Sequence, residues 1–288
     1  MNKNFDKMIE EFLSSKDENE LNKKIEELEK IYDFDAYEKE LDLEEKANKL
    51  LDKAENAKSK EEAIKYAKKA YKICQSCFEA VLFLSELELD NKKKMKILNK
   101  GLAKEKERIT KEGYFEKENI GNFYTIFETR QYIMGLFAKL DCLIINNKMK
   151  EAISIAQEII YLNNNDNMGA RFYLIAIYSY LNDLDNVLQI YKKYNENRID
   201  MLFPLFLIYY KLKNYKEANK YLKKINKYNK YFIEFFKGTI VPEKDIEFGS
   251  YIIGSSSEII MYFYKFGFLL KDVEVIKDYI LNQKTNKS

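Results

Sequence analysis

Apolar side chains recur at steps of three and four residues along most of the chain. Between Met1 and Lys58 they form two stripes that are flanked by charged residues. The first stripe is Phe5, Met8, Ile9 and Phe12, and the second is Leu21, Ile25, Leu28 and Ile31. This spacing places each stripe on one face of a helix. The pattern predicts helices that bury only one side, and no Gly- or Ser-rich linker separates them from the rest of the chain.

A second pattern begins near Glu44 and repeats. An acidic residue, Ala and an apolar residue open a helical stripe at Ala63, Ala152 and Ala218, and Asn186 marks a weaker copy. Steps of 34 and 32 positions separate Ala152, Asn186 and Ala218. A period near 34 is typical of the tetratricopeptide repeat, in which a helix-turn-helix unit stacks on its neighbours. We expect the small Ala to lie where the second helix of a pair crosses closest to the first.

Short polar turns precede these second helices. They are Asn146-Asn147-Lys148, Asn182-Asp183 and Lys213-Asn214. Asn and Asp tolerate the left-handed conformation that ends one helix, and they cap the next one. By the same reasoning, Asp166 is predicted to cap the helix that contains Ala170.

Two segments break the period. Residues 104–122 are charged and then aromatic, with Gly113 and Gly121, and they predict a long helix, a turn and a short aromatic helix. Residues 238–257 carry several Gly and Ser together with Pro242, and predict a loop. Two last helices are expected at about 257–267 and 270–282, with Ser256 or Ser257 as the cap.

The predicted fold is therefore all-α, a right-handed α-solenoid of three or four tetratricopeptide-like hairpins. Residues 1–43 form an N-terminal helical extension. Residues 44–282 form the repeat domain, with an insertion at 104–122 and a C-terminal helical cap at 243–282.

Composition narrows the possible functions. The chain has 9 Gly, 2 Pro and no His, and 49 basic side chains stand against 47 acidic ones. A balanced charge does not favour non-specific electrostatic binding to nucleic acid or anionic lipid. Without His, the usual general base and the common nucleophile pairs are missing. There is no phosphate-binding Gly motif. We therefore expect no catalysis.

The N-terminus, the longest apolar run and the cysteines indicate where in the cell the protein is expected. The N-terminus has no apolar core, and the longest apolar run, 201–210, contains Pro204 and is too short to span a bilayer. Three Cys argue against a disulfide scaffold. Cys74 and Cys77 form a C-x-x-C, but with Cys142 they give at most three zinc ligands. We expect buried thiols, no metal or other cofactor, no membrane contact and a cytoplasmic protein.

Three segments together carry a family resemblance. They read GNFYTIFETRQY at 121–132, NNNDNMGARFYL at 163–174 and GSSSEIIMYF at 254–263. In this order they resemble bacterial tetratricopeptide proteins related to the suppressor-of-tumorigenicity-7 family, although Tyr124 replaces a Trp, and Gln131 and Asn164 replace prolines. The resemblance implies helical repeats and a binding or adaptor role, and no established reaction. The residues that carry its motifs are Glu128, Arg130, Tyr132, Asp166, Asn167 and Gly169.

Arginine is scarce, so its positions matter. Arg130 and Arg171 lie in or beside these motifs, whereas Lys carries most of the positive charge. A guanidinium in place of an ammonium suggests bidentate pairing with a carboxylate. That carboxylate belongs either to a partner or, the interpretation we favour, to an internal ion pair that locks adjacent repeats.

The first helices of the pairs are expected to line a concave face. The residues predicted to bind a partner there are Phe137, Asp141, Arg171, Tyr178, Phe203 and Tyr210. This mixed apolar and aromatic face suits an amphipathic helix or an extended peptide. An alternative is that the chain's own C-terminal helices fill it.

Two hypotheses about function result. In the first, the chain is an interaction or adaptor module that binds a protein or peptide on its concave face. In the second, it is a structural or regulatory subunit with a self-filled groove. Its Lys-rich outer face, at Lys220, Lys223, Lys224 and Lys227, would then contact nucleic acid or acidic protein. Charge balance makes nucleic acid the less favoured partner.

Overall fold

The computed structural model describes residues 34–74, 77–242, 251–271 and 273–282, and for residues 34–42 the main chain alone. The regular structure of these residues is helical, without a β-strand, and helices adjacent in sequence pack in pairs. The prediction of an all-α protein is confirmed. The two apolar stripes that begin at Phe5 and Leu21 lie outside the described residues.

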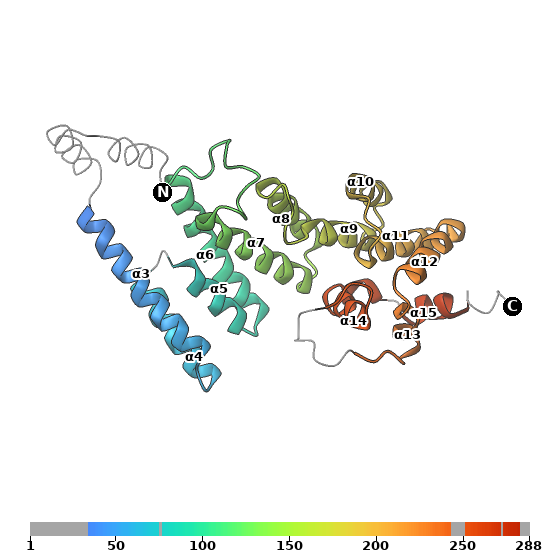
Figure 1. Cartoon of the computed structure of the whole chain (residues 1–288), viewed down its shortest axis with the longest axis horizontal. Coiled ribbons are helices and arrows are strands. Elements are labelled where there is room, and N and C mark those ends of the chain that lie inside the picture. Colours follow the sequence, from blue (N-terminus) through green and yellow to red (C-terminus); the bar gives the residue numbers. More distant parts are fainter. Residues whose placement is uncertain (1–33, 75–76, 243–250, 272, 283–288) are drawn as a thin grey trace. The chain divides into compact units, whose positions relative to one another are not determined.

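The chain divides into two compact units, residues 1–167 and 168–288. In the first unit, three helix pairs follow one another (Figure 1). They are α3 (Phe34–Glu55) with α4 (Lys60–Ile73), α5 (Phe78–Leu87) with α6 (Asn91–Lys111), and α7 (Phe127–Ile145) with α8 (Met149–Leu162). α7 also packs against α5 and α6.

The second unit contains two more pairs and a C-terminal group of helices. The pairs are α9 (Ala170–Tyr180) with α10 (Leu184–Tyr194), and α11 (Ile199–Lys211) with α12 (Tyr215–Tyr228). The group comprises α13 (Phe232–Lys237), α14 (Ser256–Lys265), the 3-10 helix η1 (Gly267–Leu270) and α15 (Val273–Asn282). Five pairs are thus described, where the sequence predicted three or four.

The turns that join the two helices within each of the pairs α7–α8, α9–α10 and α11–α12 share one geometry. Asn147, Asn182 and Lys213 have positive φ angles of 57°, 61° and 59°. At each turn the next amide donates to a carbonyl five residues back, as Lys148 does to Leu143 at 2.8 Å. This is the Schellman ending of a helix. The sequence predicted these turns correctly, except that Lys213 rather than Asn214 takes the left-handed conformation while Asn214 caps α12.

The predicted register falls at the fourth residue of α4, α8 and α12. Ala63, Ala152 and Ala218 occupy that position and are buried. In α10 the fourth residue is Val187, which is fully buried, whereas Asn186 is partly exposed. The register residue of the weaker copy is therefore Val187 and not Asn186.

Three local predictions are wrong. The segment after α6 forms turns up to Ile126 and contains no short aromatic helix. Ser255, not Ser256 or Ser257, caps α14, because its side chain accepts the amide of Glu258. Gly169, not Asp166, precedes α9 and has a φ of 76°. A Cβ on Gly169 would meet the ring of Phe172 at 2.7 Å, so this close turn favours glycine.

Small residues bring α3 and α4 together. Ala47, Ala54, Ala67 and Ala70 are buried between these helices and α5. Among the described residues, no helix combines the length and the apolar character that crossing a membrane requires.

Candidate functional site

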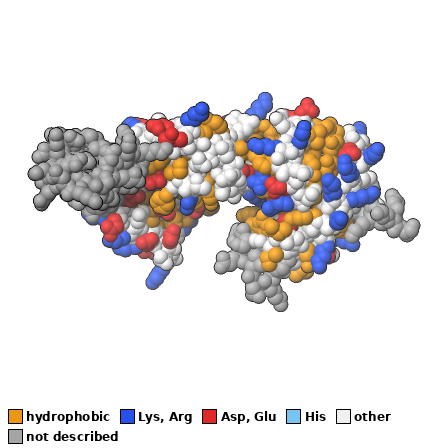
Figure 2. All heavy atoms as spheres, turned by 45° about the horizontal axis from the view of Figure 1, so that its top comes forward, with side chains coloured by type: hydrophobic (Ala, Val, Ile, Leu, Met, Phe, Trp, Pro, Cys, Tyr) orange, Lys and Arg blue, Asp and Glu red, His pale blue; other side chains and the backbone are white. Residues whose placement is uncertain are grey.

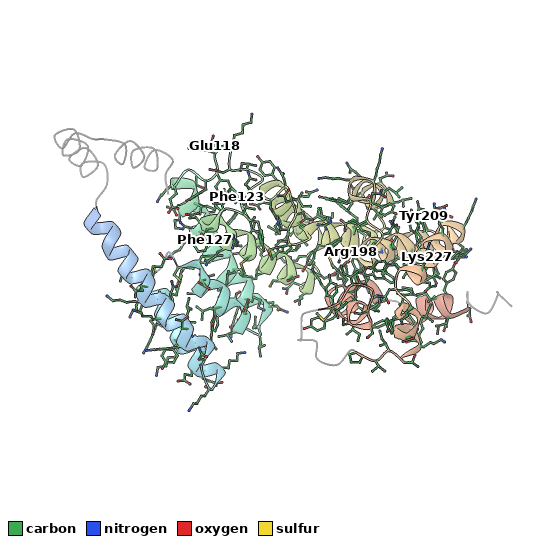
Figure 3. The ribbon with its side chains drawn as sticks, in the orientation of Figure 1. Glu118, Phe123, Phe127, Arg198, Tyr209 and Lys227 are labelled. Atoms are coloured by element: carbon green, nitrogen blue, oxygen red, sulfur yellow. The ribbon has the colours of Figure 1, made fainter. Side chains whose placement is uncertain are left out.

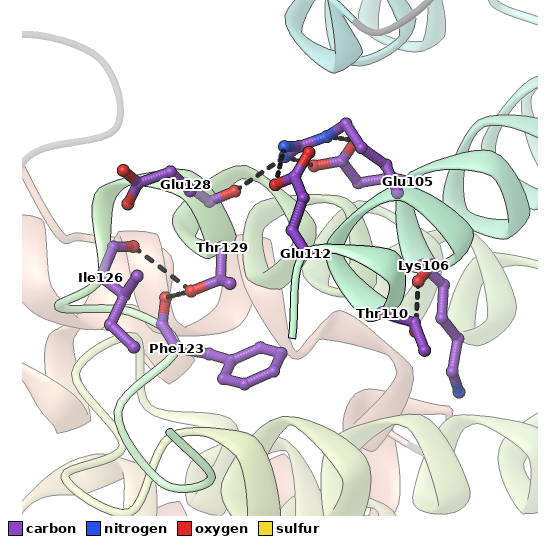
Figure 4. Close-up of polar contacts among 9 residues, drawn as sticks. Glu105, Lys106, Thr110, Glu112, Phe123, Ile126, Glu128 and Thr129 are labelled. Atoms are coloured by element: carbon purple, nitrogen blue, oxygen red, sulfur yellow. Dashed lines mark hydrogen bonds and ion pairs between the residues drawn. The ribbon is translucent and has the colours of Figure 1, made fainter. Parts of the chain in front are cut away.

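Two side chains of the FETR motif (residues 127–130) form hydrogen bonds to the main chain of the segment between α6 and α7. The Thr129 hydroxyl donates to the carbonyl of Phe123 at 2.7 Å (Figure 4), and the Arg130 Nε donates to the carbonyl of Tyr124 at 2.9 Å. Arg130 also lies 5.5 Å from the Tyr124 ring centre. The motif therefore closes a loop within the first unit, and its arginine binds a main-chain carbonyl.

Arg108 joins the same loop to α6. Its guanidinium contacts the buried carboxylate of Glu105 at 2.7 Å, Glu112 at 2.6 Å and the main-chain carbonyl of Glu128 at 3.1 Å (Figure 4). Tyr132, one turn into α7, donates to Glu158 of α8 at 3.3 Å. Glu128 and Tyr132 thus take part in contacts that hold α6, α7 and α8 together.

The second motif forms the turn that precedes α9. Asp166 is buried with a φ of 45°, Asn167 is exposed, and Gly169 makes the last turn before the helix. Asp166 also donates its amide to the carbonyl of Asn163 at 2.9 Å. Asp166 and Gly169 therefore shape the main chain of this turn.

Arg171 forms an internal ion pair. Its Nε lies 2.7 Å from the Glu196 carboxylate, and its guanidinium is 4.1 Å from the centre of the Phe172 ring. Arg198 approaches the same ring at 5.0 Å. The preferred prediction of an internal pair is confirmed for Arg171.

The six residues predicted to bind a partner do not share an open surface. Phe137, Tyr178 and Phe203 are buried. Tyr210 is partly buried, and its ring lies 4.7 Å from that of Tyr279 in α15. Asp141 is exposed on α7. The prediction of accessible binding residues is therefore wrong for Phe137 of α7, Tyr178 of α9 and Phe203 of α11.

Aromatic side chains of the C-terminal helices cover the α11 face. The Phe203 ring lies 5.0 Å from Phe263 and 5.8 Å from Tyr262, both of α14, in edge-to-face contacts. Tyr173 of α9 meets Phe266 at 5.2 Å in the same way. Figure 1 shows α13, α14 and α15 grouped with α11 and α12. Within the second unit, the chain itself fills the face that a peptide was expected to occupy.

A buried carboxylate joins the C-terminal helices to α12. Glu258, at the start of α14, accepts the Tyr228 hydroxyl at 2.6 Å, the Asn229 side-chain amide at 3.0 Å and the main-chain amide of Gly254 at 2.9 Å. The sequence singled out GSSSE only as part of the family resemblance. The sequence did not predict the hydrogen-bond partners of Glu258. The signal it offered was an acidic residue inside an apolar helical stripe.

A second polar group lies at the start of α11. Arg198 pairs with Asp200 at 3.2 Å and donates to the Tyr251 hydroxyl at 3.0 Å. Burial raises the pKa of the Asp200 carboxyl, although Arg198 and Lys265 act against this rise. The Tyr262 hydroxyl is buried without a hydrogen-bond partner among the described residues.

The outer face of α10 and α12 carries lysines over tyrosine rings. Tyr221 stacks on Tyr209 at 5.7 Å and meets Tyr191 edge-on at 6.0 Å. The ammonium groups of Lys220 and Lys224 lie 5.5 and 5.3 Å from the Tyr221 ring centre. These cation–π contacts hold both lysines in place. Lys223 and Lys227 are exposed on the same helix.

This surface, which we call the Lys–Tyr face, lies in the more basic of the two units. Residues 168–288 contain 19 Lys and Arg against 13 Asp and Glu. α12 alone has five Lys and one Glu. Lys227 and Tyr209 are labelled in Figure 3, and Figure 2 shows Lys and Arg side chains gathered over this unit. The net charge of the whole chain conceals this local excess.

The cysteines are buried thiols. Burial raises the pKa of Cys77 to about 11, and the pKa of Cys142 is raised by the same cause. Neither therefore has the low pKa of a reactive thiolate. Among the described residues, no cluster of His, Cys, Asp or Glu has the grouping of a metal site.

No family model matches this chain, and no curated protein is detectably similar to it in sequence. The resemblance to tetratricopeptide proteins and to the suppressor-of-tumorigenicity-7 family remains a prediction from the motifs.

Proposed function

We propose that the chain is a non-catalytic cytoplasmic binding module that holds an acidic protein segment on the Lys–Tyr face of α10 and α12. Its hairpins would stack in the right-handed manner of tetratricopeptide repeats within each unit. The observation that carries the proposal is the pair of lysines fixed over the buried Tyr221 ring. Lys224 is held by the Tyr191 hydroxyl at 3.4 Å as well as by this ring.

Pre-positioned ammonium groups favour binding because less side-chain entropy is lost when a carboxylate arrives. Of the four lysines, Lys220 forms an ion pair, with Glu217 at 2.7 Å. An acidic segment would add carboxylates beside Lys223, Lys224 and Lys227 without displacing that pair. The expected partner is a peptide that places several Asp or Glu side chains along one helix length.

The same geometry favours protein over nucleic acid. Single-stranded nucleic acids bind by stacking bases on exposed aromatic rings. Here the Tyr221 ring is buried under Tyr209 and Tyr191, so it offers no open platform. The lysines therefore act as point charges, which suit carboxylates along a protein segment.

The test is titration of the full chain with two fluorescent probes of equal charge, a Glu-rich peptide and single-stranded DNA, each at low and at near-physiological salt. Wild type is compared with a variant in which Lys220, Lys223, Lys224 and Lys227 become Gln. We expect this variant to bind the peptide at least tenfold more weakly. The DNA should bind wild type more weakly than the peptide does.

The matched control replaces four exposed lysines of α6, namely Lys92, Lys93, Lys96 and Lys100, by Gln. It removes the same charge from the chain at another place and should bind the peptide as wild type does. Equal losses in both variants would show a general charge effect and reject the Lys–Tyr face. Tighter binding of DNA than of peptide would reject the acidic-protein partner.

A further inference from the structure

We propose that α14 acts as a built-in ligand of the aromatic face formed by Tyr173 of α9 and Phe203 of α11. A partner helix with the same aromatic spacing would bind this face when α14 is displaced. This surface is distinct from the Lys–Tyr face, and the inference does not depend on the proposed function. The partner would be an amphipathic helix whose aromatic side chains have the spacing of Tyr262, Phe263 and Phe266.

The covering helix shows what the face accepts. Tyr262 and Phe263 of α14 and Phe266 directly after it are buried, while Tyr264 is exposed. The buried rings contact two of the paired helices, since Phe263 meets Phe203 of α11 and Phe266 meets Tyr173 of α9. An amphipathic helix lying in an apolar face is a recurrent mode of peptide recognition.

When α14 covers this face, two of its own polar side chains are buried at a cost in free energy. The Glu258 carboxylate is 2% exposed, and within the described residues its hydrogen-bond donors are neutral groups, with no Lys or Arg in ion-pair distance. Burying a charge without an opposite charge is unfavourable. The Tyr262 hydroxyl is buried without a hydrogen-bond partner in the same part of the structure, which adds a second unfavourable contribution.

The unpaired hydroxyl of Tyr262 belongs to α14 and not to the face it covers. A partner helix with Phe at the position of Tyr262 would keep the ring contacts and avoid burying that hydroxyl. Such a helix can therefore compete with the chain's own α14. Loss of the hydrogen bonds to Glu258 would shift the balance further towards the open face.

The test uses the full chain and a fluorescent synthetic peptide that copies residues 255–271 with Tyr262 replaced by Phe. Anisotropy measures its binding to wild type and to Glu258→Ala, in which the hydrogen bonds that hold α14 are lost. We expect Glu258→Ala to bind the peptide at least tenfold more tightly than wild type. The same peptide with Phe263 and Phe266 also replaced by Ala should bind at least tenfold more weakly.

Glu274→Ala, at an exposed glutamate of α15, is the matched control and should bind as wild type does. The proposal would be overturned if Glu258→Ala bound the peptide no more tightly than wild type does. It would also be overturned if the peptide lacking the two rings bound as tightly as the peptide that keeps them.

Hydrogen exchange on the wild-type chain tests the same idea without a variant. If α14 opens as a unit, its amides exchange at least tenfold faster than those of α11, which stays protected. Exchange of α14 and α11 at one common rate would show that α14 is an integral part of the core, and the proposal would then be wrong.

Discussion

The hydroxyl of Tyr228 donates a 2.6 Å hydrogen bond to the carboxylate of Glu258. Tyr228 ends α12, and Glu258 lies in the first turn of α14. Asn229, the residue after α12, donates to the same carboxylate and to the carbonyl of Ser255. The end of the last repeat helix is thereby fixed to the start of the C-terminal helices.

Removing the Tyr228 hydroxyl should weaken this joint. Tyr228→Phe keeps the ring and deletes one hydrogen bond to a charged acceptor, an interaction worth about 1.5–3 kcal/mol. We expect the free energy of unfolding of the second unit to fall by about that amount, measured by urea unfolding followed by circular dichroism. Tyr264→Phe, at an exposed tyrosine of α14, should change it by less than about 0.5 kcal/mol.

Stability should depend on pH through Asp200. Because burial raises the pKa of Asp200 in the folded chain, the folded state holds this proton at pH values where the unfolded state has lost it. The contribution of Asp200 is then fully present below the unfolded pKa, about 3.9, and is lost as pH rises through the higher folded pKa.

The measurement compares wild type with Asp200→Asn by urea unfolding at several pH values from 3.5 to 7. Asparagine cannot ionise, so the stability difference between the two proteins should shift in favour of the variant as pH rises through this window. A difference that stays constant with pH would contradict a raised pKa. Glu274→Gln, at an exposed carboxylate of α15, serves as the control for charge removal.

Much of the fold could be predicted because helix periodicity and turn chemistry are local properties. The stripes located four of the five helix pairs but missed α5 with α6. Asn147 and Asn182 took the left-handed conformation expected of Asn. The predictions failed where a distant contact decides the local structure. The amide of Phe123, for example, donates to the carbonyl of Leu162 at the end of α8, and the expected aromatic helix does not form.

The candidate site was harder to predict for the same reason. The sequence placed Phe203 on the face of α11 but could not show that Phe263, in the distant α14, would cover it. The lysine stripe of α12 was visible in the sequence. The tyrosines that position those lysines come from α10, α11 and α12, so their contacts with one another depend on the packing of two hairpins.

The stacked tyrosines under the Lys–Tyr face should resist ionisation. Burial, together with the neighbouring Tyr209 and Tyr191, raises the pKa of Tyr221 to about 12. The unfolded state loses this proton near pH 10, so the stabilisation is complete below pH 10 and is lost as pH rises towards 12. Tyr221→Phe should therefore make stability less dependent on pH in this range, as measured by urea unfolding at pH 9 to 11.

Tyr161→Phe provides the comparison, because the Tyr161 side chain is 63% exposed on α8. Its removal should leave the alkaline pH dependence unchanged. Equal behaviour of the two variants would contradict the raised pKa of Tyr221.

Gly135 is needed where α7 crosses its neighbours. A Cβ at this position would lie 2.6 Å from the Phe78 ring and 2.9 Å from a methyl group of Leu102. Alanine favours a helix by about 1 kcal/mol over glycine, whereas overpacking a core costs about 1–3 kcal/mol. Because both contacts are shorter than van der Waals distance, we expect Gly135→Ala to lower the stability of the first unit, by up to about 2 kcal/mol in urea unfolding.

The double variant Gly135→Ala with Phe78→Leu separates the steric effect from any other. Leucine is shorter than phenylalanine and should make room for the new methyl group, so the stability loss of the double variant should be smaller than the sum of the two single losses. Gly267→Ala is the control, since no atom lies within 4 Å of its expected Cβ. A stabilising Gly135→Ala, or strictly additive losses, would mean that α7 shifts to accommodate the methyl group at little cost.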